Sequence, residues 1–237
     1  MKRHLSAVIC YLVALITSTT AFGQTFPSLD GLSDGSSNAA HAGLLGKTYV
    51  ESRYVHIGTD ESVVDRFDDS FQGFDVTFNA PLPWLSEVAP NFGADIYFTY
   101  QDFGLGGSVG SMSLDIDVQS YQTGVSLYAA AFGPVRPFVQ LGAQIDVVEA
   151  TAVNGSSTLS LDDDDTSFIA NVGVEVDIAE MASIRAAIDL NEDFWDASPI
   201  TADLILWPHE QFYVRAGLFA TTDGNELGGL FGGGIVF

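Results

Sequence analysis

Apolar and polar residues alternate with a period of two along most of the chain, and the C-terminal segment shows this pattern clearly. Every second residue there falls on one face, while the other face holds only small or apolar residues. The alternating residues are Leu227, Gly229, Phe231, Gly233, Ile235 and Phe237. Such alternation predicts a β-strand. Because chain ends usually fray in water, this strand is expected in apolar surroundings, either a protein core or a bilayer.

The same alternation predicts nine further strands upstream of the C-terminal one. They cover about 46–57, 71–80, 92–103, 112–130, 138–150, 168–178, 183–191, 200–207 and 212–221. In the segment 112–130 the apolar positions change parity near 120–122, which predicts a β-bulge.

The connections between these strands alternate between short turns and longer loops. The longer loops are predicted at 58–70, 104–111, 151–167, 192–199 and 222–227. This alternation is typical of an all-β, antiparallel, up-and-down outer-membrane barrel with short periplasmic turns. Because the first strand is irregular, eight strands is an alternative to ten.

The N-terminus has the layout of a secretory signal peptide. Lys2 and Arg3 precede a short apolar run at 7–16, and small residues precede Gln24. We therefore predict a signal peptide at 1–23, a flexible segment at 24–45 and the barrel at 46–237. The only cysteine lies in the signal peptide, so a mature chain without disulfides needs another source of stability. A closed barrel is one such source, since all of its backbone groups are paired.

The composition restricts the possible partners. Only 16% of residues are charged, yet the formal net charge is −23. No basic face for nucleic acid can be built from eight Lys and Arg residues. Cations, cationic ligands or basic surfaces are the expected partners.

The polar face of the strands carries arginines together with carboxylates and almost no lysine. A soluble β-sandwich would place a water-exposed face there, normally rich in Lys and Glu. An Arg facing lipid would cost about 2–4 kcal/mol at the midplane, so these residues are expected inside a barrel. The predicted polar network of the lumen consists of Arg53, Asp75, Asp95, Glu175, Arg185 and Arg215.

Aromatic residues gather near the predicted strand ends, as expected for girdles at the two membrane interfaces. They are Phe71, Trp84, Phe92, Phe103, Phe132, Phe138, Phe168, Trp207, Phe212 and Phe237.

With its signal peptide, alternating strands and last strand ending in Phe237, the chain resembles the small outer-membrane β-barrels of the OmpA-like and opacity-type class. The resemblance covers about 46–237, and only the last strand is a motif. It implies a location in the cell outer membrane of a Gram-negative-type envelope and contact with outer-membrane lipid. It also implies that the barrel-assembly machinery reads Phe237 as an assembly signal.

Candidate chemistry is sparse. Asp162, Asp163, Asp164 and Asp165 fall in the predicted loop 151–167, where they form either a hydrated acidic tip or a weak Ca²⁺ or Mg²⁺ site. A second acidic loop lies at 58–70, and no other cofactor is predicted. His56 is the only candidate base at the outer rim, and no catalytic motif is present.

We therefore expect a barrel with a structural or surface-interaction role and without catalysis. The alternatives are a narrow cation-preferring diffusion pore and a secreted soluble β-sandwich that binds a ligand. The sequence leaves the extracellular ligand open.

Overall fold

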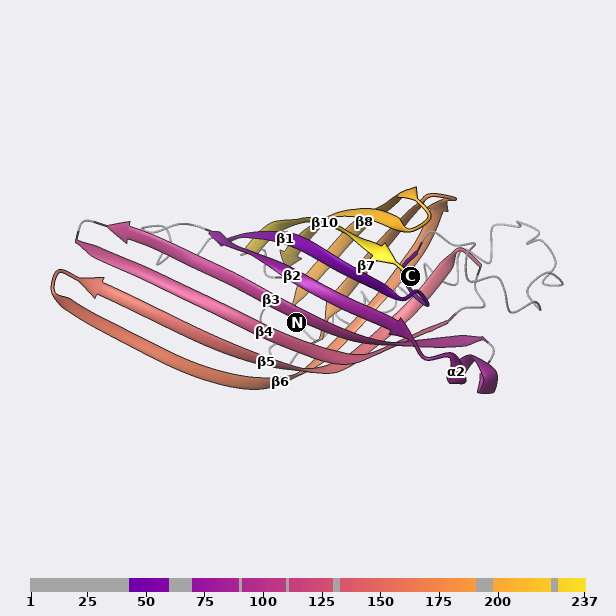
Figure 1. Cartoon of the computed structure of the whole chain (residues 1–237), viewed down its shortest axis with the longest axis horizontal. Coiled ribbons are helices and arrows are strands. Elements are labelled where there is room, and N and C mark those ends of the chain that lie inside the picture. Colours follow the sequence, from indigo (N-terminus) through magenta and orange to yellow (C-terminus); the bar gives the residue numbers. More distant parts are fainter. Residues whose placement is uncertain are drawn as a thin grey trace. The chain divides into compact units, whose positions relative to one another are not determined.

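Ten β-strands form from the alternating segments and close into one antiparallel barrel in the computed structural model (Figure 1). The structure describes residues 43–59, 70–89, 91–109, 111–129, 133–190, 198–222 and 226–237. The predicted signal peptide, most of the segment 24–45 and most of the loop 58–70 therefore lie outside the described residues. No helix in the described part of the chain is long and apolar enough to cross a membrane.

The strands follow one another around the barrel in chain order. They are β1 (Tyr49–Thr59), β2 (Ser70–Pro81), β3 (Phe92–Val109), β4 (Met112–Ala129), β5 (Val135–Asn154), β6 (Ser157–Ala179), β7 (Ala182–Asp189), β8 (Pro199–His209), β9 (Phe212–Thr221) and β10 (Glu226–Val236). One short helix, α2 (Pro83–Val88), lies in the β2–β3 connection.

The first and last strands pair along their whole length and close the barrel. Tyr49 lies opposite Val236, and Thr59 lies opposite Glu226. The prediction of ten strands is confirmed, and the alternative of eight is wrong. Every strand has two neighbours in one closed sheet. The alternative of a two-sheet sandwich is therefore wrong.

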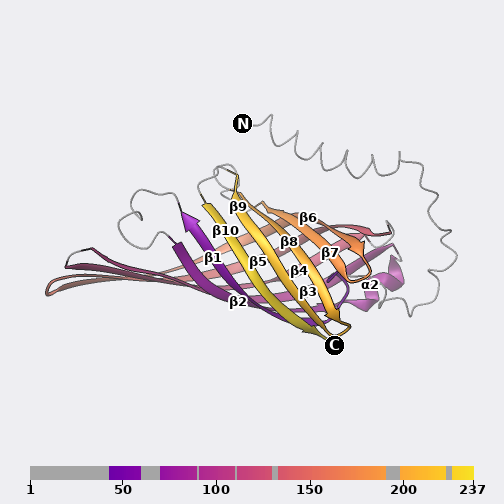
Figure 2. The ribbon, with the colours of Figure 1, turned by 90° about the horizontal axis from the view of Figure 1, so that it is seen from above.

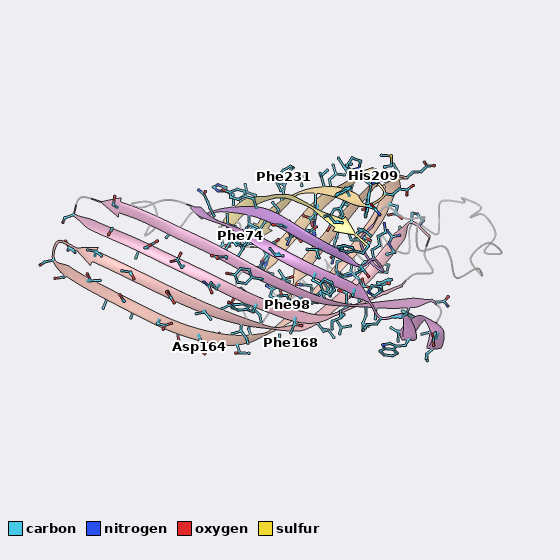
Figure 3. All side chains as sticks on the ribbon, in the orientation of Figure 1. Phe74, Phe98, Asp164, Phe168, His209 and Phe231 are labelled. Carbon is cyan, nitrogen blue, oxygen red and sulfur yellow. The ribbon has the colours of Figure 1, made fainter. Side chains whose placement is uncertain are left out.

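The two faces of each strand differ as the alternation predicts. On β2, Phe74 and Phe78 are exposed, whereas Asp75 and Asn79 are buried. Phe74, Phe98, Phe168 and Phe231 project outward around the barrel (Figure 3). A closed barrel with apolar side chains outside and carboxylates inside satisfies the requirements of a lipid bilayer. This arrangement places the chain in the outer membrane of a Gram-negative-type envelope.

The chain ends and the short turns define the periplasmic end of the barrel. β6 and β7 are joined through residues 180–181, and β8 and β9 through residues 210–211. The start of β1 and the end of β10 lie at this same end. The longer hairpins project from the opposite, extracellular end.

Four strands continue past the barrel and form a sheet extension (Figures 1 and 2). Pairing of β3 with β2 stops at Gly104, and pairing of β6 with β7 starts only at Asn171. We call residues 105–109, 112–118, 148–154 and 157–170 the extension. The predicted loops 104–111 and 151–167 are therefore wrong, because most of these residues continue strands β3 to β6.

The predicted bulge near residues 120–122 is also wrong. β4 pairs with both neighbours without any shift of register along Met112–Ala129. The apolar positions change parity because the environment changes. Leu127 and Val125 face outward within the bilayer, whereas Asp117 and Asp115 face outward beyond it.

The aromatic girdle differs from the prediction. Phe138 and Trp207 are buried inside the barrel, and Phe103 lines the lumen, so these three are not part of a girdle. Tyrosines complete the extracellular side, with the rings of Tyr100 and Tyr121 5.2 Å apart. The Tyr100 hydroxyl donates to Asp102, and the Tyr121 hydroxyl donates to Gln119. Each acceptor lies two residues further along its strand towards the extracellular side. Such amphipathic rings suit the level of the lipid headgroups.

Candidate functional site

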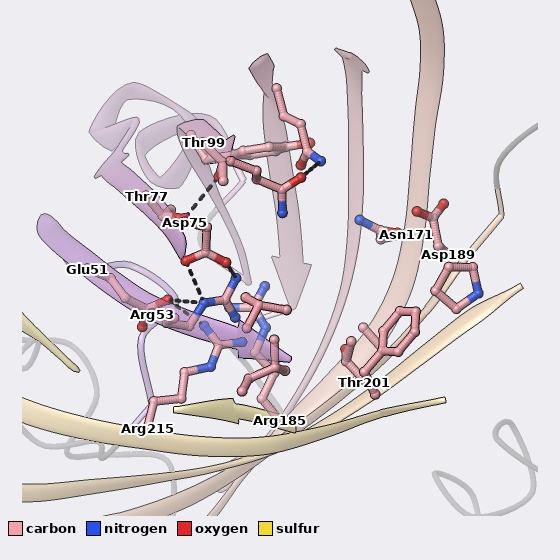
Figure 4. Close-up of a pocket in the computed structure, with 18 of the residues that line it drawn as sticks. Glu51, Arg53, Asp75, Thr77, Thr99, Asn171, Arg185, Asp189, Thr201 and Arg215 are labelled. Atoms are coloured by element: carbon pink, nitrogen blue, oxygen red, sulfur yellow. Dashed lines mark hydrogen bonds and ion pairs between the residues drawn. The ribbon is translucent and has the colours of Figure 1, made fainter. Parts of the chain in front are cut away.

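The first half of the lumen network joins two arginines to three carboxylates (Figure 4). The Arg53 guanidinium donates to Asp75 with an Nε–Oδ1 distance of 2.9 Å, and it also lies 3.2 Å from Glu51. Arg215 donates to Glu51 at 2.9 Å and to Asp203 at 2.6 Å. Because neighbouring inward positions of β1, β2, β8 and β9 supply all five groups, the ion pairs tie four strands together.

The second half of the network is centred on Arg136 at the start of β5. Its guanidinium donates to Asp177 at 2.8 Å and to Glu175 at 3.3 Å. The Glu175 carboxylate, fully buried, also accepts the backbone N–H groups of Leu44 and Leu45. Glu175 therefore fixes the segment that precedes β1 inside the barrel.

Residues 43–48 form a plug at the periplasmic end. The Gly46 N–H donates to Asp95 at 2.9 Å, and the Asn79 amide donates to the same Asp95 oxygen and to the Lys47 carbonyl. Leu44 is fully buried in the apolar cluster of this end. That cluster consists of Leu44, Tyr49, Ile205, Trp207 and Tyr213. The plug and the cluster pack together inside the barrel wall.

The Lys47 ammonium lies over the Trp207 ring, 3.9 Å from its centroid. Burial lowers the pKa of Lys47 to about 8, against the opposing attraction of Glu175. The unfolded chain, with an ordinary lysine pKa of 10.5, therefore binds more protons between pH 8 and 10.5. Unfolding free energy linked to Lys47 should rise with pH across this window. Urea midpoints at several pH values check this, and in Lys47→Met this part of the pH dependence should vanish.

Arg185 on β7 differs from the other lumen arginines. Its guanidinium carbon lies 4.4 Å from the centroid of the Phe138 ring. Its neighbours across the sheet, Glu175 and Asp203, pair with Arg136 and Arg215 instead. Among the described residues, Arg185 makes no ion pair, and its side chain lines the cavity (Figure 4).

A cavity of about 330 Å³ lies within the lumen. Its periplasmic side is charged and polar, and its extracellular side combines apolar side chains with the polar Asp189 and Thr201. The polar lining includes Glu51, Arg53, Asp75, Thr77, Tyr97, Thr99, Arg185 and Arg215, and the apolar lining includes Val55, Ile57, Phe103, Ala187, Pro199, Phe219 and Leu230. Asn171, Asp189 and Thr201 form the wall opposite the ion pairs (Figure 4).

Tyr97 is held against the barrel wall by two glycines. Gly124 and Gly142 are cross-strand partners on β4 and β5, and the Tyr97 hydroxyl lies over both. A Cβ atom at either glycine would stand 2.7 Å from the hydroxyl oxygen. These glycines therefore provide the space that places the Tyr97 ring at the cavity wall.

The four consecutive aspartates lie in strand β6, and the prediction of a loop there is wrong. Asp162 and Asp164 point to the outer face, and Asp163 and Asp165 to the inner face, because side chains alternate along a strand. Figure 3 shows Asp164 on the extension. Among the described residues no three acidic, His or Cys side chains group as metal ligands. The Ca²⁺ or Mg²⁺ site stays a prediction that this alternation does not favour.

All six residues predicted for the lumen lie on the inner face, but Asp95 binds the plug and Arg185 stacks on Phe138. Arg136 is absent from the predicted network because residue 136 falls between the predicted strands 112–130 and 138–150. Residue 136 lies four positions before Gln140 and therefore on the same inner face of β5, and this spacing could have placed Arg136 in the lumen. Phe237 is exposed, and its backbone N–H donates to Thr48 at 3.0 Å. Its role as an assembly signal stays a prediction.

No family model and no curated protein matches the chain. Among solved structures, the transport unit of the autotransporter AIDA-I from Escherichia coli is similar, with a TM-score of 0.50 at 10% identity over 94% of this chain and 97% of that chain. The translocator domain of the autotransporter NalP from Neisseria meningitidis has a TM-score of 0.43 at 12% identity, over 98% and 100%. The attachment invasion locus protein Ail of Yersinia pestis has a TM-score of 0.41 at 15% identity, over 82% and 100%.

At these identities the likeness to the AIDA-I transport unit concerns the fold alone. That fold, with the closed ten-strand topology, is the outer-membrane β-barrel. The prediction of this class is confirmed.

Proposed function

We propose that this protein is a non-conducting, non-catalytic surface-interaction barrel, whose extension presents an acidic face to a cationic partner. The observation that carries the proposal is a row of carboxylates across three strands. Asp117 lies opposite Glu149, and Glu149 lies opposite Asp162, all on the outer face of the extension.

Such a row is costly to the sheet that carries it. Like charges directly opposite one another destabilise a strand pair. Asp115 and Asp164 add further carboxylates to the same exposed face. Their summed negative potential attracts a basic protein surface or peptide and accelerates its association at low ionic strength.

The lumen supports a closed barrel rather than a pore. The Arg53–Asp75 and Arg215–Glu51–Asp203 ion pairs project into the interior from β1, β2, β8 and β9. The plug and its apolar cluster pack below them. His56, the only candidate base, is exposed on the outward face of β1, away from the lumen carboxylates, which favours a role without catalysis.

Binding of a lysine-rich peptide to the barrel in nanodiscs tests the surface role. The triple variant Asp117→Asn, Glu149→Gln and Asp162→Asn should weaken binding at least about tenfold at low salt, because it removes three negative charges from the face that contacts the peptide. Asp146→Asn, Asp163→Asn and Asp165→Asn remove the same charge from the inner face and should leave most of the affinity. Equal losses in the two triple variants would show that only net charge matters.

Recording in planar bilayers separates the closed barrel from the alternative pore. We expect no conductance steps from the wild-type protein at moderate voltage, because the plug and the ion pairs occupy the lumen. Steps with cation preference in the wild type would replace the proposal by the narrow diffusion pore.

A further inference from the structure

The cavity in the lumen is amphipathic along the barrel axis. Glu51, Arg53 and Arg185 lie on its periplasmic side, and Val55 and Phe219 lie towards the extracellular mouth. Its volume of about 330 Å³ equals the share of about eleven liquid waters and falls in the range of small-ligand pockets. A ligand that fits this gradient has one charged end and one apolar end.

The charge of the ligand follows from Arg185. This side chain is 92% buried, since its relative exposure is 8%. A guanidinium has five N–H donors and no acceptor, and among the described residues the Arg185 donors meet no carboxylate. Of the carboxylates within electrostatic reach of Arg185, Asp203 pairs with Arg215, and Asp95 accepts hydrogen bonds from Gly46 and Asn79. A buried cation of this kind is completed by an anion that enters the cavity.

A second polar group points to the same anion. The Tyr97 hydroxyl is buried at the cavity wall and has no hydrogen-bond partner in the part of the chain that the structure describes. Leaving such a group unsatisfied is unfavourable, and a phenolic O–H donates readily to a carboxylate oxygen. The glycine pair Gly124 and Gly142 keeps the Tyr97 ring in place.

The inner face of β3 and β4 stays apolar beyond the cavity. Phe103 lies opposite Val118, and Leu105 lies opposite Ile116, on the face of β3 and β4 that continues the lumen wall. Leu105 is nearly fully buried, which shows that this part of the face is already shielded from water. The apolar end of a ligand therefore contacts the cavity lining itself, at Val55, Phe103 and Phe219.

We propose that the cavity binds a small amphiphilic monocarboxylate. Its carboxylate accepts hydrogen bonds from Arg185 and from the Tyr97 hydroxyl. Its apolar body packs against Val55, Phe103 and Phe219. The binding is non-covalent and independent of the acidic outer face of the extension.

The probe for this site is 4-phenylbutanoate, titrated into the full barrel in nanodiscs with empty nanodiscs as the blank. We expect saturable binding that is at least about tenfold tighter than binding of 4-phenylbutan-1-ol, because a charge-assisted hydrogen bond to Arg185 is lost in the alcohol. In Arg185→Gln this preference for the carboxylate should disappear. Tyr97→Phe should reduce it by a smaller factor.

The control variant is Lys47→Gln, which removes a basic group that does not line the cavity and leaves the Arg136–Glu175 ion pair in place, so it should keep the carboxylate preference. Heat-modifiable gel mobility checks that each variant is folded. Among the described residues Arg185 makes no ion pair, and its cross-strand neighbours Glu175 and Asp203 keep Arg136 and Arg215, so Arg185→Gln should fold. A carboxylate preference unchanged in Arg185→Gln overturns the proposal. Absence of saturable binding by the wild type, or tighter binding of 4-phenylbutylamine, overturns it too.

Discussion

Replacing Arg215→Met should destabilise the barrel by about 3–5 kcal/mol. The methionine fills a similar volume but leaves Glu51 and Asp203 without their shared cation. Both carboxylates are almost completely buried, and Arg215 is the arginine that bonds to both. Urea unfolding of the refolded protein in micelles, followed by heat-modifiable gel mobility, measures the loss.

Two further variants separate the charge from the side-chain volume. The triple variant Glu51→Gln, Asp203→Asn and Arg215→Met removes the unpaired Asp203 charge and the Glu51 charge, which would keep only Arg53, and should recover most of the stability. Asp164→Asn, on the exposed face of the extension, should change it by less than about 0.5 kcal/mol. A fully stable Arg215→Met protein would mean that water or a neighbouring cation replaces the guanidinium and that the network has little energetic weight.

The period of two was sufficient to predict the ten strands and the side that most residues of the barrel face. On β9 the prediction 212–221 equals the observed Phe212–Thr221. Arg53, Arg185 and Arg215 lie inside because an unpaired charge in hydrocarbon costs several kcal/mol, and this cost leaves a strong pattern in the sequence.

The lengths of β3 to β6 could not be predicted by the same rule. Inside the bilayer the outward face must be apolar, whereas beyond it the outward face can be acidic. Asp162–Asp165 therefore looked like a loop although hydrogen bonding with β5 continues through it. The missing information was the position of the bilayer boundary, at which the outward-facing pattern is inverted.

The plug and the cavity depend on contacts between distant segments. Leu44 and Leu45 bind Glu175, which is about 130 residues away in sequence. Arg185 lies opposite Glu175 and Asp203 in the sheet, but Glu175 pairs with Arg136 and Asp203 pairs with Arg215. Local sequence patterns do not show which arginine each carboxylate binds. Arg185 was therefore predicted as part of the ion-pair network.

The position of the bilayer boundary can be tested with two matched substitutions. Phe231 and Leu161 are both large, apolar and similarly exposed, at 65% and 64%. Phe231 lies near the middle of β10, on the outer face of the barrel, whereas Leu161 lies on the inner face of the extension in β6, on the same side as Asp163. We expect Phe231→Arg to destabilise the barrel in lipid vesicles by about 2–4 kcal/mol, the cost of an arginine near the bilayer midplane.

Leu161→Arg should change the stability by less than about 0.5 kcal/mol, because its side chain stands in water on the far side of the boundary. The urea dependence of folding into vesicles measures both values under one condition. If the two substitutions cost the same, the exposed apolar residues of the barrel and of the extension share one environment. The separation between a lipid-facing belt and a water-facing extension, on which the acidic interaction surface depends, would then be lost.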